Sequence, residues 1–217
     1  MFRSHCCLLI LVTPFTSVNL ADASELDADR PEIGFVALFD GQSKKGWDGD
    51  WSIFRIDRDQ IVGGQLESNI PHNYFLVHEG NFGDFDLRLQ FRLLGVATNS
   101  GVQIRSQRIP NHHEMIGYQA DLGQTYWGCL YDESRRNRVL ASPVASELDK
   151  VLKREEWNDY RILCEGRRIR LWVNGLKTVD FTEPDVSIPL RGKIGLQIHG
   201  GPPGETRFRR VRIKPLN

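Results

Sequence analysis

The chain has 217 residues, with 28 Lys and Arg against 28 Asp and Glu, so its formal net charge is zero. Hydrophobic residues make up 40% and charged residues 26%, which excludes disordered chains, collagen-like chains and proteins with several membrane spans. A dedicated nucleic-acid-binding domain normally carries an excess of Lys and Arg, so the balanced charge excludes that class as well.

Residues 1–23 are predicted to be a secretory signal peptide. Arg3 supplies the positive start, residues 6–12 are an apolar stretch, and Ala21 or Ala23 offers a small residue for cleavage. The alternative is a frayed hydrophobic N-terminus. The apolar stretch is too short to span a bilayer, so no membrane span is expected. We therefore expect a secreted or periplasmic protein whose mature part, residues 24–217, is one domain.

The rest of the chain is predicted to form short strands. Residues 84–94 and 192–200 alternate between apolar and polar side chains, which indicates strands with one buried and one solvated face. Further strands are expected at residues 35–40, 51–56, 74–78, 100–107, 118–122, 126–132, 160–164, 168–174 and 206–214. Turns are expected at residues 63–64, 165–166, 174–175 and 200–203. Ser146 is expected to cap one short helix with Leu148, Val151 and Leu152 on its apolar face.

About a dozen short strands without a fixed repeat predict an all-β sandwich or barrel. No interior linker divides the chain between residues 35 and 213. Two cysteines, Cys129 and Cys164, remain after the predicted signal peptide, and both a disulfide and two buried free thiols stay open. His112, His113 and Glu114 are expected to lie in a loop.

Outward-facing polar side chains are the candidates for function. Gln119 and Asp121 lie two residues apart, so on a strand they share one face. A segment rich in aromatic and charged residues follows them, with Tyr126, Trp127, Tyr131, Asp132, Glu133, Arg135 and Arg136. Aromatic rings that stack on a sugar, beside charged groups that bind its hydroxyls, suit a carbohydrate. The alternative is a structural strand pair with an ion-pair cluster at its end.

Seven short motifs occur in one order along residues 33–215. They are Phe39-Asp40-Gly41 with Gly46-Trp47, Asp84-Phe85-Asp86, the segment Asn99-Ser100-Gly101 to Arg105, Gly117-Tyr118-Gln119, Glu156-Trp157-Asn158, Asn174-Gly175, and the segment Gly195 to Gly200. In this order the chain resembles the 3-keto-disaccharide hydrolase domain family of bacterial secreted proteins. The resemblance implies a concanavalin A-like, lectin-like jelly-roll β-sandwich that cleaves glycosides oxidised to a ketone at C3.

The family's polar signature maps here onto Asn99, Ser100, Arg105, Gln119, Asp121 and His199. Many relatives carry Glu and then Gln in the Gly-Tyr motif, where this chain has Gln119 and then Asp121. The acid is therefore displaced by two positions, which is about 6–7 Å along a strand.

A mechanism follows from the chemistry of a 3-keto sugar. The ketone acidifies the proton on C2, and the oxygen on C1 can then leave by elimination, with or without later addition of water. We assign catalysis to Asp121 or His199 for proton transfer and to Arg105 at the enolate oxygen. The expected substrate-binding residues are Asn99, Ser100, Gln103, Gln119, Tyr126, Trp127, Tyr131, Asp132 and Arg135.

Two alternatives stay open at this point. A divalent metal ion with Asp121, Gln119 and His199 as ligands could replace Arg105 at the oxygen, although no ligand spacing in the sequence requires it. A carbohydrate-binding module without catalysis would use the same fold and the same aromatic face. In both cases the expected partner is a glycoside.

Overall fold

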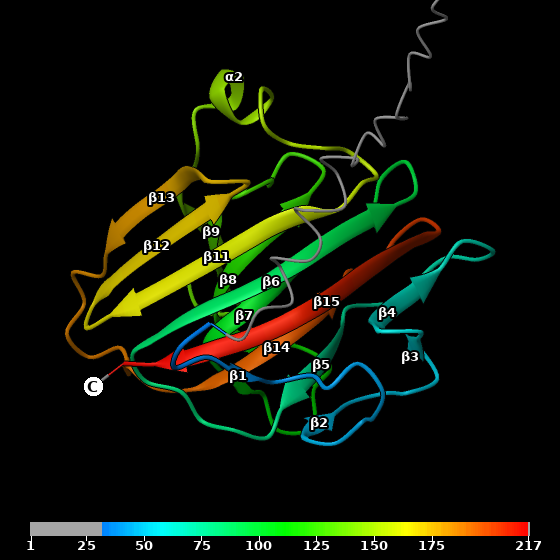
Figure 1. The fold of residues 1–217 in the computed structure, drawn as a ribbon, viewed down its shortest axis with the longest axis horizontal. Helices are drawn as coiled ribbons and strands as arrows, with labels where there is room; N and C mark the ends of the chain where they lie inside the picture. Colours follow the sequence, from blue (N-terminus) through cyan, green and yellow to red (C-terminus); the bar gives the residue numbers. More distant parts are fainter. Residues whose placement is uncertain (1–31, 217) are drawn as a thin grey trace, which may run out of the picture. The chain divides into compact units, whose positions relative to one another are not determined.

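Two antiparallel β-sheets lie face to face in the computed structural model, which describes residues 32–216 (Figure 1). In spatial order, the eight-stranded sheet contains β13 (Leu176–Thr182), β12 (Arg168–Val173), β11 (Asn158–Glu165), β6 (Phe85–Leu94), β15 (Gly204–Pro215), β4 (Gln60–Gln65) and β3 (Phe54–Asp57), with β1 (Val36–Ala37) paired to β15. The seven-stranded sheet contains β10 (Arg138–Ala141), β9 (Leu130–Glu133), β8 (Met115–Gly123), β7 (Asn99–Arg108), β14 (Lys193–Ile198), β5 (Tyr74–His78) and β2 (Trp47–Asp48). The predicted all-β sandwich is confirmed.

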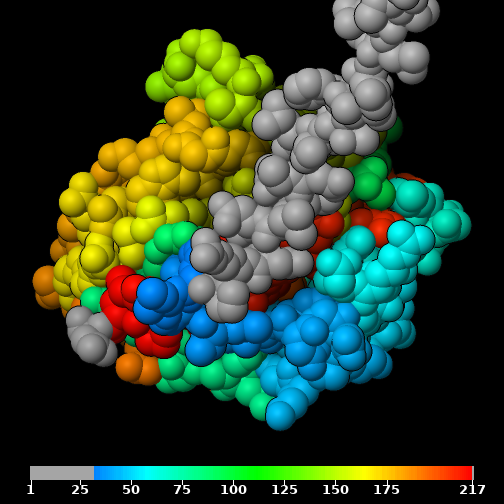
Figure 2. Space-filling view, viewed as in Figure 1, coloured from blue at the N-terminus to red at the C-terminus, as the bar shows by residue number. Residues whose placement is uncertain are grey.

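The core lies between the two sheets. On β6, the alternation seen in the sequence buries Leu87, Leu89 and Phe91 completely or nearly so. On β7, Val102 and Ile104 face the same core from the other sheet. Burial of each such side chain contributes about 1.5–3 kcal/mol, so the inner faces hold the two sheets together. Figure 2 shows the outer side of the eight-stranded sheet, which is the layer nearer the viewer.

Local predictions were confirmed where backbone chemistry dominates. Asn174 and Gly175 both have positive φ, at 47° and 82°, and they join β12 to β13 as the predicted two-residue hairpin turn.

The expected turn at Gly63 and Gly64 is wrong, because both glycines lie inside β4 and pair with β15. A side chain on Gly63 would lie 2.6 Å from the ring of Phe54, so close strand packing accounts for this glycine.

Other predictions needed correction. The short helix α2 spans Ala145–Leu148, so Ser146 lies within it, and the cap residue Val144 makes no side-chain hydrogen bond. Residues 126–129 form a turn rather than a strand, and β9 begins only at Leu130. Cys129 and Cys164 are both buried free thiols.

The predicted signal peptide lies outside the described residues. No helix among residues 32–216 is long and apolar enough to cross a membrane.

Candidate functional site

The outer face of the seven-stranded sheet carries a grid of side chains fixed by strand register. Three neighbouring rows cross the strands, and each row contains a glycine. The rows are Phe75, Gln197, Gly101 and Asp121; then Val77, Gly195, Gln103, Gln119 and Tyr131; then Lys193, Ser106, Gly117 and Glu133. Neighbouring strands lie about 4.8 Å apart, so side chains that follow one another in a row can touch.

Hydrogen bonds join the central side chains of this grid. Gln103 Nε2 donates to Gln119 Oε1 at 2.8 Å, and Gln119 Nε2 donates to Asp121 Oδ1 and to Gln197 Oε1, both at 3.2 Å. A Cβ on Gly101 would lie 2.5 Å from Gln119 Cγ, so the glycine leaves the space that Gln119 occupies. We call Gln103, Gln119, Asp121 and Gln197 the amide network.

Asp121 is the acid of the amide network. Burial raises its pKa well above the usual range, and hydrogen bonds from Gln119 and from the Leu122 backbone N–H offset only part of this effect. This shift favours the protonated form of the side chain. A carboxylic acid held neutral in this way can donate a hydrogen bond to a negatively charged oxygen.

Glu133 lies on the same face, two residues after Tyr131. Burial raises the pKa of Glu133 to about 7, with a further contribution from the negative charge of Glu114. Near neutral pH this carboxyl group is present in both ionisation states, which suits a group that accepts and returns a proton. Burial and the charge of Glu133 also raise the pKa of Tyr131, whose ring lies 6.0 Å from that of Tyr126.

The β7–β8 hairpin folds over the grid on the side of β14 and β5. Met115 packs with Phe75 and Val77 in a small buried cluster, although all three belong to the outer face. The register of the hairpin shifts between Ile104 and Gln107, and Arg105 has a φ of 50° at this point. This bulge bends the end of the β7–β8 hairpin toward β14 and β5 of the same sheet.

The loop of this hairpin reaches the segment before β5. The ring of His113 lies 4.4 Å from that of His72, and Asn73 Nδ2 donates to Glu114 Oε1 at 3.0 Å. The loop position expected for His112, His113 and Glu114 is therefore correct. The contact places Glu114 near Glu133.

Six of the predicted site residues belong to this outer face: Asn99, Gln103, Gln119, Asp121, Tyr131 and His199. Tyr126 joins them through its contact with Tyr131. His199 is exposed, and its Nδ1 lies 2.6 Å from the Gly200 carbonyl oxygen. That carbonyl can only accept, so Nδ1 carries the hydrogen and Nε2 is left as an acceptor in the neutral ring.

Arg105 does not belong to the face. At the bulge its side chain turns toward the eight-stranded sheet, where it donates to the carbonyls of Gly83 and Gly166 and to Asp84. Its side chain is 1% exposed, so all three contacts are internal to the fold. The assignment of Arg105 to the enolate oxygen is therefore replaced by a structural role.

Ser100 and Trp127 also lie elsewhere. The Ser100 hydroxyl is buried against Thr206 of the opposite sheet and donates to the Gln197 carbonyl at 2.6 Å. Trp127 packs beside Phe91, with the Arg154 guanidinium 5.7 Å from its ring centre. Neither residue can stack on or bind a sugar held over the amide network.

Asp132 and Arg135 form part of a buried ion-pair cluster. Asp132 is fully buried and pairs with both Arg135 and Arg136, and Arg136 also pairs with Glu183 at 2.6 Å. Tyr118 donates from its hydroxyl to Glu183. The sequence left two interpretations of this segment open, a sugar-binding surface and an ion-pair cluster at the end of a strand pair. For Asp132 and Arg135 the contacts are those of the ion-pair cluster.

Three residues of the site received no catalytic or substrate-binding role from the sequence, although Glu133 stood in the charged segment after Asp121: Gln197, Glu133 and Glu114. Gln197 and Glu133 could have been found by period-two alternation, since Gln197 precedes His199 by two residues and Glu133 follows Tyr131 by two. Nothing in the sequence indicated that the hairpin would bring Glu114 to them.

The metal alternative gains no support from the side chains of the described region. Among residues 32–216, no group of three or more His, Cys, Asp or Glu side chains could hold a metal ion. Gln119 turns its Nε2, which is a donor, toward Asp121, whereas a shared metal ion would require an amide oxygen there.

Comparisons with known proteins agree with this architecture. Residues 34–214 match the model of a family described as the 3-keto-alpha-glucoside-1,2-lyase-like domain. No curated protein matches the chain. A "putative glycosyl hydrolase" from Parabacteroides distasonis ATCC 8503 is 20% identical with a TM-score of 0.65, over 92% of this chain and 98% of that one.

Two further solved structures share the fold at lower identity. The carbohydrate-binding module CBM66 from Bacillus subtilis is 14% identical with a TM-score of 0.58, over 77% of this chain and 94% of that one. A Bacillus subtilis protein of unknown function with a galectin-like fold is 12% identical with a TM-score of 0.60, over 84% of this chain and 94% of that one. The expected lectin-like sandwich is confirmed.

Proposed function

The chain belongs to the 3-keto-alpha-glucoside-1,2-lyase-like domain family, and from this membership we propose that it cleaves glycosides whose sugar carries a ketone at C3. The observation that carries the proposal is the presence of two carboxyl groups with raised pKa values on one sheet face. Glu133 has a pKa of about 7, and burial raises the pKa of Asp121, which accepts a hydrogen bond from Gln119 of the amide network. Proton removal next to a ketone requires such a base and such a donor.

The reaction begins at C2. The Glu133 carboxylate takes the C2 proton, and the electrons of the C–H bond form the enolate of the C3 ketone. The Asp121 carboxylic acid donates a hydrogen bond to the enolate oxygen, the task first assigned to Arg105. The C1–O bond then breaks, and the leaving oxygen receives the proton that Glu133 holds. The product is an enone, to which water can add to give net hydrolysis.

The other residues of the face bind the sugar. Two buried polar atoms there, Gln197 Nε2 and Asn99 Oδ1, have no hydrogen-bond partner among residues 32–216. Each unpaired atom costs about 1–3 kcal/mol, and since both atoms are enclosed by neighbouring side chains, a sugar hydroxyl pairs with them only if those side chains move on binding. Tyr126 and Tyr131 supply the aromatic surfaces on which a sugar ring stacks.

The experiment compares an aryl 3-keto-glucoside with the same glucoside before oxidation. We expect release of the aryl alcohol from the keto form alone, because only the ketone acidifies the C2 proton. Released alcohol is followed by absorbance, with boiled protein as the control for spontaneous elimination of the keto substrate. Equal release from both forms would indicate another glycosidase mechanism and would overturn the proposal.

A carbohydrate-binding module remains the second candidate. The specific observation in its favour is that amides occupy three of the four positions of the amide network, and amides bind hydroxyls without transferring protons. Saturable binding of both glucosides with no product from either would establish this second function. The predicted signal peptide would place either activity outside the cytoplasm.

A further inference from the structure

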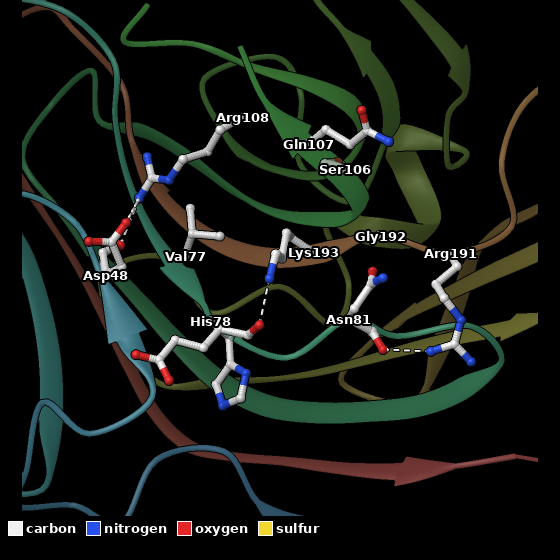
Figure 3. Close-up of a pocket in the computed structure, with 11 residues that line it drawn as sticks. Asp48, Val77, His78, Asn81, Ser106, Gln107, Arg108, Arg191, Gly192 and Lys193 are labelled. Carbon is white, nitrogen blue, oxygen red and sulfur yellow. Dashed lines mark hydrogen bonds and ion pairs between the residues drawn. The ribbon is translucent and has the colours of Figure 1, made fainter. Parts of the chain in front are cut away.

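A hollow lies at the end of the seven-stranded sheet where β7 ends and β14 begins (Figure 3). It is a cavity of about 670 Å³, lined by Val77 and His78 of β5, by residues 106–108 of β7 and by residues 191–193. Glu133, Asp121 and the two tyrosines of the first site do not line it. The side chains that line the cavity therefore differ from those that were assigned to catalysis and to sugar stacking.

Three cationic side chains line this cavity: Arg108, Arg191 and Lys193. Figure 3 shows Lys193 between the other two. Lys193 donates to the Glu79 backbone carbonyl at 2.5 Å, and Arg191 donates to the Asn81 backbone carbonyl at 2.7 Å. A carbonyl carries no net charge, so neither cation is neutralised by a carboxylate among the described residues.

The acids of the cavity do not cancel this charge. Asp48 pairs with Arg108 at 3.0 Å, and its side chain is 73% exposed, so water screens it. Glu79 is the second acid in the lining, which leaves three cations against two acids. Burial lowers the pKa of His78, so His78 is neutral near pH 7.

The segment that carries Arg191 and Lys193 is held in place from both sides. Gly192 exchanges two backbone hydrogen bonds with Phe82, at 2.8 and 3.0 Å. A Cβ on Gly192 would lie 2.3 Å from the carbonyl carbon of Arg105, so the backbone of β7 lies directly against it. Arg191 and Lys193 are thus attached to a fixed backbone. This lowers the entropic cost of ordering their side chains around a ligand.

We propose that this cavity is a second ligand site, for an oxyanion such as a carboxylate, sulfate or phosphate group. Arginine and lysine side chains form their strongest hydrogen bonds with such groups, and both cations keep unused donors. The oxyanion can be a free inorganic ion or the acidic group of a saccharide. The cavity lies beside the proposed cleavage site, because Lys193 and Ser106 share a row with Glu133, but no residue given a role in that cleavage lines it.

The test measures binding by calorimetry and thermal unfolding on the full protein. Sulfate, phosphate and glucuronic acid are titrated at constant ionic strength, with glucose as the neutral control. We expect saturable binding of at least one anion, with a rise in the unfolding midpoint of about 2–4 °C well above its Kd. Tighter binding of glucuronic acid identifies an acidic saccharide, and equal or tighter binding of the inorganic ions identifies a free ion.

The variants locate the binding. The double substitution Arg191→Gln and Lys193→Gln should weaken it at least about 10-fold, which is the loss of one charge-assisted hydrogen bond. The matched control, Lys150→Gln with Arg154→Gln, changes two cations near α2 and should leave it unchanged. Asp48→Asn releases Arg108 from its ion pair and should tighten binding. No saturable binding of any anion, or equal binding by the double variant, would overturn the proposal.

Discussion

Replacement of Glu133 by Gln is expected to lower kcat for a 3-keto-glucoside by about 10²- to 10⁴-fold, the usual contribution of a positioned general base. The amide keeps the size and the hydrogen-bonding capacity of the side chain, but it cannot accept the C2 proton. In the native protein the rate should rise with pH and level off above about 7, because the carboxylate is the active form and the pKa of Glu133 is about 7. The variant should lose this dependence.

Two variants serve as comparisons. Glu156→Gln changes an exposed acid away from the site and should leave kcat unchanged. Asp121→Asn keeps a hydrogen-bond donor in the amide network and should lower kcat less than Glu133→Gln does. Full activity of Glu133→Gln would show that another group removes the proton, and the assignment of the base would then be wrong.

A stability measurement shows whether the Glu133→Gln variant is folded. The folded pKa of Glu133 is raised above its unfolded value of 4.5, so the contribution of this residue to stability is complete below pH 4.5 and is lost as the pH rises through about 7. The Gln side chain does not ionise. We therefore compare the free energies of unfolding of the variant and the native protein at two pH values. The difference in favour of the variant should be larger at pH 8 than at pH 5.

Replacement of Arg105 by Met is expected to destabilise the fold by about 3 kcal/mol while leaving the kcat of the folded protein unchanged. The substitution removes three hydrogen bonds from a buried cation to Gly83, Gly166 and Asp84. For a domain of this size the midpoint of thermal unfolding should fall by about 6–12 °C. Chemical unfolding and initial rates, measured on the same sample, separate the two effects.

Arg108→Met is the matched control for this substitution, since it changes an arginine of the same strand. Arg108 is 41% exposed and pairs with the largely exposed Asp48, so its loss should cost at most about 1 kcal/mol. If Arg105→Met kept native stability but lost activity, Arg105 would be catalytic and its structural assignment would be wrong.

The fold could be predicted from the sequence because its signals are local. Alternation along residues 84–94 identified the strand that became β6, and Asn174 with Gly175 identified a hairpin. The same alternation brought Gln119, Asp121 and Tyr131 to one face. A strand has a side-chain period of two wherever it is regular, so these predictions depend only on neighbouring residues.

The remaining site residues could not be predicted because the strand becomes irregular. The bulge at Arg105 sends that side chain to the opposite sheet, although the alternation up to Ile104 places it outward. The same bend carries Glu114 over the grid. Asp132 looked like a ligand for a hydroxyl, but its two arginine partners are fixed by a turn that sequence spacing alone does not reveal.

The central claim is that cleavage begins with removal of the C2 proton. The most direct measurement compares the rate of leaving-group release from a 3-keto-glucoside with hydrogen or with deuterium at C2. We predict slower release from the deuterated substrate in single-turnover conditions, because the C2–H bond breaks in the step that Glu133 catalyses. Equal single-turnover rates for the two substrates would contradict the account.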